Sequence, residues 1–362
     1  MSSRTAVDAG QPGPAAALPP AAAGPLATRR GGAWRARRLR KTVELTILLG
    51  PALILFVGFV LLPIVIAAYY SLFNWTGYGP LNDFVGLHNY KVAFNDPVFV
   101  QAIEHTLILT VLALLVQGPI SLAIALLLNR KFRGRAFMRL VIFAPYVLPP
   151  AVTAVMWSLM LQPGGFVDQV MKSVGLGGLV QLWLANIHIV LYTNFVVLTW
   201  QYIGFGIVLL LAGLQGIPAE LKEAAAIDGA TPWQVTRAVT LPLLAPTIRI
   251  WVFITVIGSL QVFDIVWILT GGGPANASTT MATYMFLDGF RSLEFGYGCA
   301  IAVIMFAFCF VFSIVYQRFA LRRDTAGALT PGSSSSRVAA YCERAMIVRP
   351  SSASPCGPTS AR

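Results

Sequence analysis

The sequence has little charge. Of its 362 residues only 11% are charged, whereas 57% are hydrophobic. A soluble domain carries roughly 25% charged residues, which it needs in order to cover its surface with groups that bind water. The shortage of charge therefore excludes an ordinary soluble enzyme and predicts a protein that crosses a membrane several times.

Metal-binding and nucleotide-binding patterns are also missing. The sequence contains three histidines and four cysteines. The histidines form no His-Glu motif, and no two cysteines have the spacing of metal ligands. No glycine-rich loop ends in Lys-Ser or Lys-Thr, so we expect no ATP site on this chain. The sequence thus predicts a protein that is not an enzyme and holds no metal or cofactor of its own.

Long apolar stretches are what the sequence has in abundance. Six of them contain about 20 or more residues, enough to cross the roughly 30 Å hydrocarbon layer of a bilayer. In lipid the backbone must satisfy its own hydrogen bonds, and the alternating polarity of barrel strands is not seen, so we expect helices. The predicted fold class is all-α, a polytopic membrane protein with six transmembrane helices. The stretches cover residues 45–69, 107–128, 140–161, 187–211, 247–269 and 296–316.

The positive charge alternates between the connecting segments. Lysine and arginine total 26 against 14 acidic residues, and they gather before the first stretch, between the second and third, between the fourth and fifth, and after the sixth. The other connections hold only Lys91, Lys172 and Arg291. Positive loops mark the cytoplasmic side of a membrane protein, so both termini are predicted to be cytoplasmic and a nucleic-acid patch is disfavoured.

Four parts of the chain follow from this layout. Residues 1–42 are predicted to be a disordered basic cytoplasmic tail, because they are rich in alanine, glycine and proline and lack apolar periodicity. Residues 43–103 would hold the first span and an extracytoplasmic loop. Residues 104–318 would form a core of the other five spans, and residues 319–362 a second disordered cytoplasmic tail.

The connection between the fourth and fifth stretches is long and patterned. Pro218 suits the first turn of a helix, and Gly229 suits the left-handed cap at its end. Thr231 and Pro232 are typical of the start of a second short helix, which Pro242 and Pro246 are expected to end. We therefore predict two short helices lying across the cytoplasmic face. A helix that only rests on lipid headgroups is the alternative, which the alanine-rich acidic surface disfavours.

Motifs in this connection resemble a known family. They are typical of the "EAA" loop of ABC-importer membrane subunits, and they comprise Glu223, Ala224, Ala225, Asp228, Gly229, Ala230, Leu241 and Pro242. Further motifs at 135–139, 145–149, 263–264, 269–274 and 296–302 resemble the carbohydrate-uptake permeases of the maltose and glycerol-phosphate transporter type. The resemblance covers roughly residues 43–323. Two positions depart from it, since the family usually has an aromatic residue at Thr236 and asparagine at His105.

The resemblance implies the type I ABC importer fold, with residues 104–318 as its transmembrane core in a bacterial inner membrane. It implies four kinds of partner: a second, similar permease, a dimer of cytoplasmic ATPases that binds ATP and Mg²⁺, an extracytoplasmic sugar-binding protein, and the lipid bilayer. The eight residues of the EAA loop would couple this chain to one ATPase. Transport would then proceed by alternating access between inward-open and outward-open states.

Polar and aromatic side chains inside the spans are the candidates for the substrate pathway. Sugars are held by aromatic faces and by groups that hydrogen-bond their hydroxyls, and polar groups inside a membrane are functional candidates. Helix packing or an interfacial belt is the alternative for the aromatic residues, and a helix cap or a partner contact is the alternative for the aspartate. The candidates are Tyr146, Trp200, Gln201, Tyr202, Phe205, Ser259, Gln261 and Asp264.

The rival function is an ion-coupled secondary carrier. Such a carrier needs paired ionisable groups in the membrane, and Asp264 has no basic partner at its expected depth. The sequence does not identify the substrate, which could be an oligosaccharide, a monosaccharide or glycerol 3-phosphate. A phosphate ester would favour Arg or Lys facing the pathway, and we expect none deep in the spans, which favours a neutral sugar.

Overall fold

A computed structural model describes residues 44, 46–130 and 132–321 of the chain. The chain divides into two compact units, Met1–Pro63 and Ile64–Arg362, and each is described by itself. The predicted tails lie outside the described residues, apart from 319–321, which are helical. The first candidate membrane span, Thr46–Tyr70, has a mean hydropathy of 2.7, which confirms the first predicted stretch.

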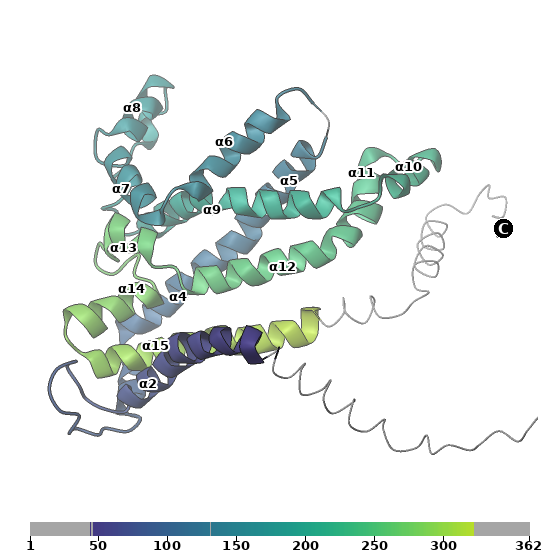
Figure 1. Ribbon diagram of the computed structural model, residues 1–362. Helices are drawn as coiled ribbons and strands as arrows, with labels where there is room; N and C mark the ends of the chain where they lie inside the picture. Colours follow the sequence, from purple (N-terminus) through teal and green to yellow (C-terminus); the bar gives the residue numbers. More distant parts are fainter. Residues whose placement is uncertain (1–43, 45, 131, 322–362) are drawn as a thin grey trace, which may run out of the picture. The chain divides into compact units, whose positions relative to one another are not determined.

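The described residues of the second unit form helices joined by turns and irregular loops, and Phe73 and Phe84 form an isolated β-bridge. The first helix of Figure 1, α2, crosses the boundary between the units. The α-helices are α2 (Leu62–Tyr70), α3 (His88–Asn95), α4 (Pro97–Leu112), α5 (Gly118–Leu128), α6 (Arg135–Val147), α7 (Pro150–Met160), α8 (Phe166–Ser173), α9 (Val190–Gln215), α10 (Ala219–Ile227), α11 (Pro232–Val235), α12 (Leu241–Leu260), α13 (Asp264–Thr270), α14 (Met281–Phe286) and α15 (Phe295–Tyr316).

Short turns of other helix types extend or join these helices. The π-helical turns are η1 (Val57–Leu61), η2 (Ala113–Gln117), η4 (Thr236–Thr240), η5 (Leu287–Arg291) and η6 (Gln317–Leu321), and η3 (Gly177–Leu179) is a 3₁₀ turn. With these turns included, the remaining long apolar helices are Pro97–Leu128, Val190–Gln215, Pro232–Leu260 and Phe295–Phe319. Among the described residues five helices can cross a membrane, and six if one bent pair of helices counts as a span.

The third predicted span is that bent pair. The sequence led us to expect one helix over 140–161, but α6 and α7 meet at an angle of 98°. Leu148 between them is extended, with φ −69° and ψ 139°. A residue that precedes proline is pushed out of the helical region, and Leu148 precedes Pro149. The expectation of a straight helix was therefore wrong for this span.

The fifth predicted span also has different ends. We expected it over 247–269, after a break at Pro242 and Pro246, but the helix runs unbroken from Pro232 to Leu260. The π-helical turn η4 explains this continuity, because the Leu241 N–H reaches back five residues to the Thr236 carbonyl just before Pro242. Pro246 lies inside α12, so neither proline ends a helix.

The core of the second unit consists of three clusters, and α9 contributes to two of them. One joins α4, α12, α14 and α15, the second joins α5, α9 and α12, and the third joins α7, α9 and α13. In lipid such contacts are driven by close packing rather than by removal of apolar surface from water. The position of α9 between α5, α6 and α12 is visible in Figure 1. A displacement of α9 would therefore disturb the packing of two of the three clusters.

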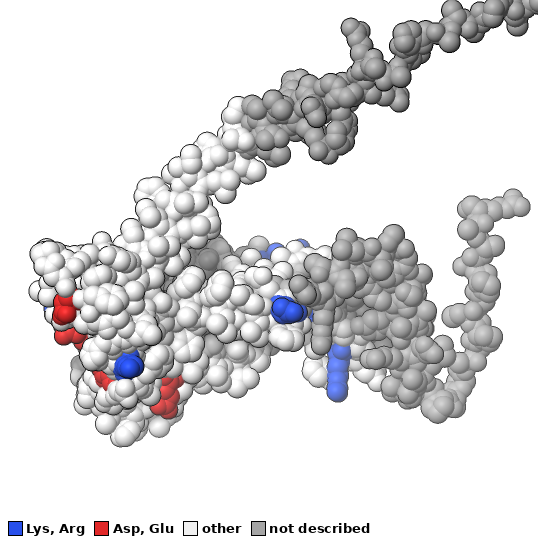
Figure 2. Space-filling view, turned by 90° about the horizontal axis from the view of Figure 1, so that it is seen from below, with Lys and Arg blue, Asp and Glu red and all other residues white. Residues whose placement is uncertain are grey.

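Charged side chains are unevenly distributed over the surface of the second unit. Figure 2 shows acidic side chains together with some basic surface at one end of this unit, a broad surface without charge next to them, and further basic side chains beyond it. Charged groups avoid the hydrocarbon layer of a bilayer. The uncharged surface is therefore consistent with the apolar spans that lie beneath it.

Candidate functional site

The connection from α9 to α10 is short. Helix α9 ends at Gln215 with Gly216 as its cap, and α10 begins at Ala219. Pro218 is the residue immediately before α10 rather than a member of its first turn, so its predicted position was wrong by one residue. Only 216–218 separate the two helices, so α10 is held close to the end of a long membrane-spanning helix.

The C-terminal end of α10 is closed by Gly229, as the sequence predicts. Gly229 has φ +82°, in the left-handed region that costs other residues free energy. The Gly229 N–H bonds the Ala226 carbonyl and the Ala230 N–H bonds the Ala225 carbonyl, both at 3.0 Å. This pair of bonds is the Schellman arrangement, which satisfies carbonyls that a helix end leaves open. The chain turns sharply here into the next helix.

Thr231 caps the helix that follows, also as predicted. Its hydroxyl accepts a hydrogen bond from the Gln234 N–H at 3.4 Å, and the Gln234 side-chain oxygen accepts one from the Thr231 N–H at 2.8 Å. The two bonds form a capping box, with Pro232 at the first helical position. This helix is α11, and it continues through η4 into α12. The second predicted short helix is therefore the first turn of a membrane-spanning helix.

The surface of this loop is exposed. Among the eight predicted coupling residues, Glu223, Ala224, Asp228, Gly229 and Pro242 are exposed, and Ala225, Ala230 and Leu241 are half-buried. Figure 1 shows α10 and α11 at the opposite end of the second unit from α13 and α14.

Two large apolar side chains flank this turn, and our sequence analysis did not select them. Ile227 is 85% exposed and Trp233 is 67% exposed. Their signal in the sequence is an apolar residue on either side of an otherwise small and polar turn. The position that departs from the family pattern, Thr236, is half-buried, and its hydroxyl donates to the Pro232 carbonyl at 2.9 Å. The turn between α10 and α11 is thus exposed and is capped on both sides. We call residues 219–235 the docking loop.

The predicted substrate-pathway residues fall into two groups. The first surrounds the bend between α6 and α7. The Tyr146 ring lies stacked on Phe205, with centroids 5.3 Å apart, and it is 6.4 Å from the Tyr202 ring. Trp200 instead packs edge-to-face on Trp157, with centroids 5.6 Å apart. We call Tyr146, Tyr202 and Phe205 the ring group.

Gln201 belongs to the same region but is buried. Only 1% of its surface is exposed. Its amide nitrogen donates to the Leu148 carbonyl at 2.8 Å, and its amide oxygen accepts from the Thr153 hydroxyl at 2.5 Å. This amide is therefore bonded to both sides of the bend.

The second group lies at the break between α12 and α13. We expected Ser259, Gln261 and Asp264 all to lie on the fifth span, but α12 ends at Leu260 and only Ser259 belongs to it. Gln261 follows α12 and its amide points to the Cys309 sulfur at 3.5 Å. Asp264 is exposed in the first turn of α13, where the helix dipole favours a carboxylate. The view of Asp264 as part of a broken helix fits this position.

Arg249 lies inside the helix Pro232–Leu260, near the start of the predicted fifth stretch 247–269. It is half-buried, and the Tyr316 hydroxyl donates to its carbonyl at 2.9 Å. The expectation that no basic residue faces the pathway deep in the spans, which favours a neutral sugar, stays a prediction.

Polar contacts fix the end of the unit that carries α13 and α14. His105, 8% exposed, bonds the Thr279 carbonyl through Nδ1 at 3.0 Å. A carbonyl only accepts, so Nδ1 carries the proton. This bond explains what the histidine does at a position where the family usually has asparagine. The Tyr284 hydroxyl donates to the Asp96 carboxylate, and burial together with that carboxylate raises the pKa of Tyr284.

A further carboxylate holds the loop that follows α7. The Asp168 oxygens accept from the Gly164 N–H and from the Trp183 indole N–H, each at 2.8 Å. These bonds favour the ionised form and hold the pKa of Asp168 below its ordinary value. The side chain therefore links α8 to the chain on both sides of it.

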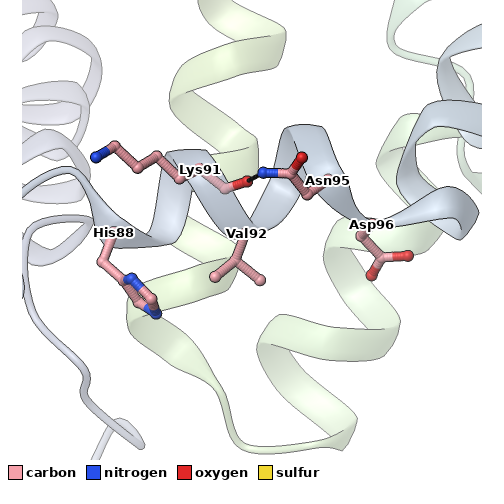
Figure 3. Close-up of a pocket in the computed structure, with 5 residues that line it drawn as sticks. All are labelled: His88, Lys91, Val92, Asn95 and Asp96. Carbon is pink, nitrogen blue, oxygen red and sulfur yellow. Dashed lines mark hydrogen bonds between the residues drawn. The ribbon is translucent and has the colours of Figure 1, made fainter.

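An open hollow lies over α3. It has a volume of about 410 Å³ and is lined by His88, Lys91, Val92, Asn95 and Asp96. Figure 3 shows Lys91 pointing away from the other lining side chains, while the Asn95 amide donates to its carbonyl at 2.7 Å. The Asp96 carboxylate is already bonded to the Val98 N–H and the Tyr284 hydroxyl. None of the predicted pathway residues lines this hollow, and its charged groups do not converge on one point.

Comparisons with known proteins agree on one family. The profile of the family described as "Binding-protein-dependent transport system inner membrane component" matches residues 117–325. The multiple sugar-binding transport system permease protein MsmF of Streptococcus mutans is 36% identical over 73% of this chain and 90% of its own length. The diacetylchitobiose uptake system permease protein NgcF of Streptomyces coelicolor is 32% identical over 87% of this chain and 95% of its own length.

A solved structure has the same fold. It is the crystal structure of a bacterial ABC transporter involved in the import of the acidic polysaccharide alginate. The superposition has a TM-score of 0.68 at 24% identity and covers 79% of this chain and 99% of the other. The all-α fold of an ABC-importer permease is thereby confirmed.

Proposed function

The chain belongs to the family of binding-protein-dependent transport system inner membrane components, and we propose that it is a sugar-transporting permease subunit of an ATP-driven importer. Its substrate is an oligosaccharide or a monosaccharide. The sugar assignment is supported by the names of relatives that are more than 30% identical. The chain forms one half of the pathway and works by alternating access.

The docking loop is the observation that carries this proposal. It is exposed, it is capped at both of its helices, and it connects α9 directly to α12. Ile227 and Trp233 give it an apolar edge on either side of the Gly229 turn. A carrier driven by an ion gradient has no use for such a surface. We assign it to contact with a cytoplasmic ATPase, which binds ATP and Mg²⁺ in place of this chain.

The remaining parts of the transporter follow from this assignment. A second, similar permease completes the pathway, and a sugar-binding protein delivers the substrate from the other side of the bacterial inner membrane. The docking loop and both chain termini then face the cytoplasm, as the positive connections indicate. The alternation of charge along the sequence supports this orientation.

The ring group is our candidate for the substrate pathway. Tyr146 and Tyr202 are each 37% exposed, so part of each residue is accessible to a ligand. Aromatic faces pack on the apolar side of a sugar ring, while hydroxyls replace the water bonds that the sugar loses. Trp200, Ser259, Gln261 and Asp264 remain candidates with less structural support, because they lie outside this group of rings.

Reconstitution tests the proposal. The cognate binding protein is first screened by thermal shift against a panel of sugars that includes maltose, trehalose and diacetylchitobiose, with glycerol 3-phosphate added. The sugar that stabilises it most is then supplied in radiolabelled form to proteoliposomes that contain the assembled transporter. We expect accumulation that requires internal ATP and the ATPase. Accumulation driven by an ion gradient in vesicles without the ATPase would instead support the ion-coupled carrier.

A further inference from the structure

The bend between α6 and α7 creates a local shortage of hydrogen-bond donors. The last carbonyls of any helix have no partner within the helix. Here the next two residues are Pro149 and Pro150, which have no N–H to offer, and the chain turns by 98°. Inside a membrane no water replaces the missing donor, and an unsatisfied backbone group is strongly unfavourable. The Leu148 carbonyl therefore needs a donor from elsewhere in the protein.

Gln201 supplies this donor and also holds the other side of the bend. Its amide nitrogen donates to the Leu148 carbonyl at 2.8 Å. Its amide oxygen accepts from the hydroxyl of Thr153, in the first turn of α7, at 2.5 Å. Gln201 and Thr153 are 1% and 0% exposed. One amide thus fixes the end of α6 and the start of α7 to α9, and its burial leaves no surface for a sugar.

The packing of α6 on α9 reinforces this attachment. A Cβ atom added to Gly204 would lie 2.5 Å from the Ile142 carbonyl oxygen, so the two backbones are in contact there. From Gln201, helix α9 continues to Gln215, and three residues separate it from α10. At 1.5 Å per residue, Gln201 lies roughly 20 Å from that end of α9. A displacement of the docking loop therefore reaches Gln201 through a single unbroken helix.

We infer that Gln201 is a positioning residue and not a sugar ligand. It fastens the bent pair α6–α7 to α9, so that α7, the ring group and α9 move as one body. This corrects the expectation that Gln201 contacts the substrate. The further statement that movement of the docking loop drives this body depends on the proposed function, whereas the fastening itself does not.

Distance measurements by pulsed electron paramagnetic resonance test the fastening. Spin labels are placed at Leu159 on α7 and Val196 on α9, which are 60% and 56% exposed, in an assembled transporter cleared of its native cysteines. We expect a single distance in the parent protein, unchanged when MgATP and vanadate trap the ATPases closed. Gln201→Leu roughly keeps the side-chain volume but removes both hydrogen bonds. In this variant we expect a broad distribution of Leu159–Val196 distances in place of the single parental distance. The matched control is Gln261→Leu, which removes another amide among the predicted pathway residues. This variant should keep the parental Leu159–Val196 distance.

A milder pair of variants covers the case in which Gln201→Leu does not assemble. Thr153→Val removes one of the two bonds and keeps the shape, and it should broaden the distribution, while Thr153→Ser should restore it. The double variant should be no worse than Gln201→Leu alone, because both changes act on one bonded unit. A parental distance distribution in Gln201→Leu or in Thr153→Val would overturn the inference. So would a parent distance that itself changes on trapping.

The two proposals fail in different ways. A single spin label at Ile227, which is 85% exposed, reports through its mobility whether addition of the ATPase immobilises the docking loop. If the label stays mobile with the ATPase present while Gln201→Leu still loses the single Leu159–Val196 distance, the fastening stands and the coupling to an ATPase falls. If the ATPase immobilises the label but Gln201→Leu keeps the parental Leu159–Val196 distance, the importer stands and the role of Gln201 falls.

Discussion

The docking loop and the α6–α7 bend both redirect the chain sharply, but they are held in opposite ways. The docking loop is exposed, and its bonds join residues three to five positions apart, such as Gly229 to Ala226 and Ala230 to Ala225. The bend is exposed at Leu148, but Gln201 and Thr153, which hold it, are buried, and the bonds from Gln201 join residues 48 and 53 positions apart. The docking loop is thus held by bonds between residues close in the sequence, whereas the bend depends on a donor from the neighbouring helix α9. The following changes test how far this contrast holds.

The largest effect is expected from Gly229→Val. A branched side chain in the left-handed region costs about 1–2 kcal/mol, so the capped turn should open and transport by the assembled importer should fall about tenfold or more. Gly216→Val is the matched control, because Gly216 has an ordinary φ of −75° and also lies at a helix end. Uptake assays in proteoliposomes compare the two. Equal transport by both variants would show that the left-handed turn is not needed for docking.

The next largest effect is expected from Gly204→Ala on the side of the bend. The added methyl would lie 2.5 Å from the Ile142 carbonyl oxygen, and overpacking of this kind costs about 1–3 kcal/mol. The thermal unfolding midpoint of the purified protein should fall. Gly258→Ala is the control, since a Cβ atom at Gly258 would meet nothing within 4 Å. Equal thermal unfolding midpoints for the two variants would show that the backbones of α6 and α9 are not in contact at Gly204.

A smaller effect is expected from Thr231→Ala in the docking loop. Removal of an N-cap side chain costs about 1 kcal/mol, so hydrogen exchange at the Gln234 amide should accelerate severalfold. Thr231→Ser should keep the cap and the parental rate. The melting midpoint should barely move, because the loop is exposed and contributes little to the core. A large loss of global stability would contradict the view that this loop is held only by its own sequence.

The smallest effect is expected from Asp168→Asn, which probes bonds of intermediate range. The Asp168 carboxylate bonds residues 4 and 15 positions away. Its pKa is lowered in the folded state, so its contribution to stability is present above the ordinary carboxyl pKa of about 3.9 and is lost as pH falls through the lowered pKa. Exchange at the Gly164 amide, corrected for intrinsic rates, should be faster in the variant at pH 7. The two proteins should converge at acidic pH, and a difference that persisted there would exclude the carboxylate as its source.

The same contrast explains what could be predicted from the sequence. The apolar stretches, the caps of Gly229 and Thr231 and the first turn at Pro232 were predictable, because each depends on residue type and on neighbours close in the sequence, whereas the bend of the third span and the ends of the fifth were not. The family motifs added the fold, which the solved structure confirms. The coupling role of the eight EAA residues remains a prediction that transport assays must test.

The errors share a different cause. The 98° bend could not be read from residues 140–161, although two adjacent prolines hinted at it, because its stability rests on Gln201 and Thr153 together. The role of Gln201 was misread for the same reason, since an intramembrane amide looks like a ligand until its partners are known. At Pro242 the usual rule for proline failed, because a π-helical turn changed the bonding just before it.

That π-helical turn makes the effect of chain length depend on position. Thr236–Thr240 holds about one residue more per turn than an α-helix needs, whereas each residue of an α-helix rotates the chain by about 100°. Deleting one residue from this turn would leave a regular α-helix with α11 and α12 on nearly their present faces, because the wider turn has already absorbed the extra residue. Deleting one residue from the regular part of α12 would instead rotate α11 and everything attached to it around the axis by roughly 100°. The docking loop would keep its caps and its composition, but it would present a different side to the partner.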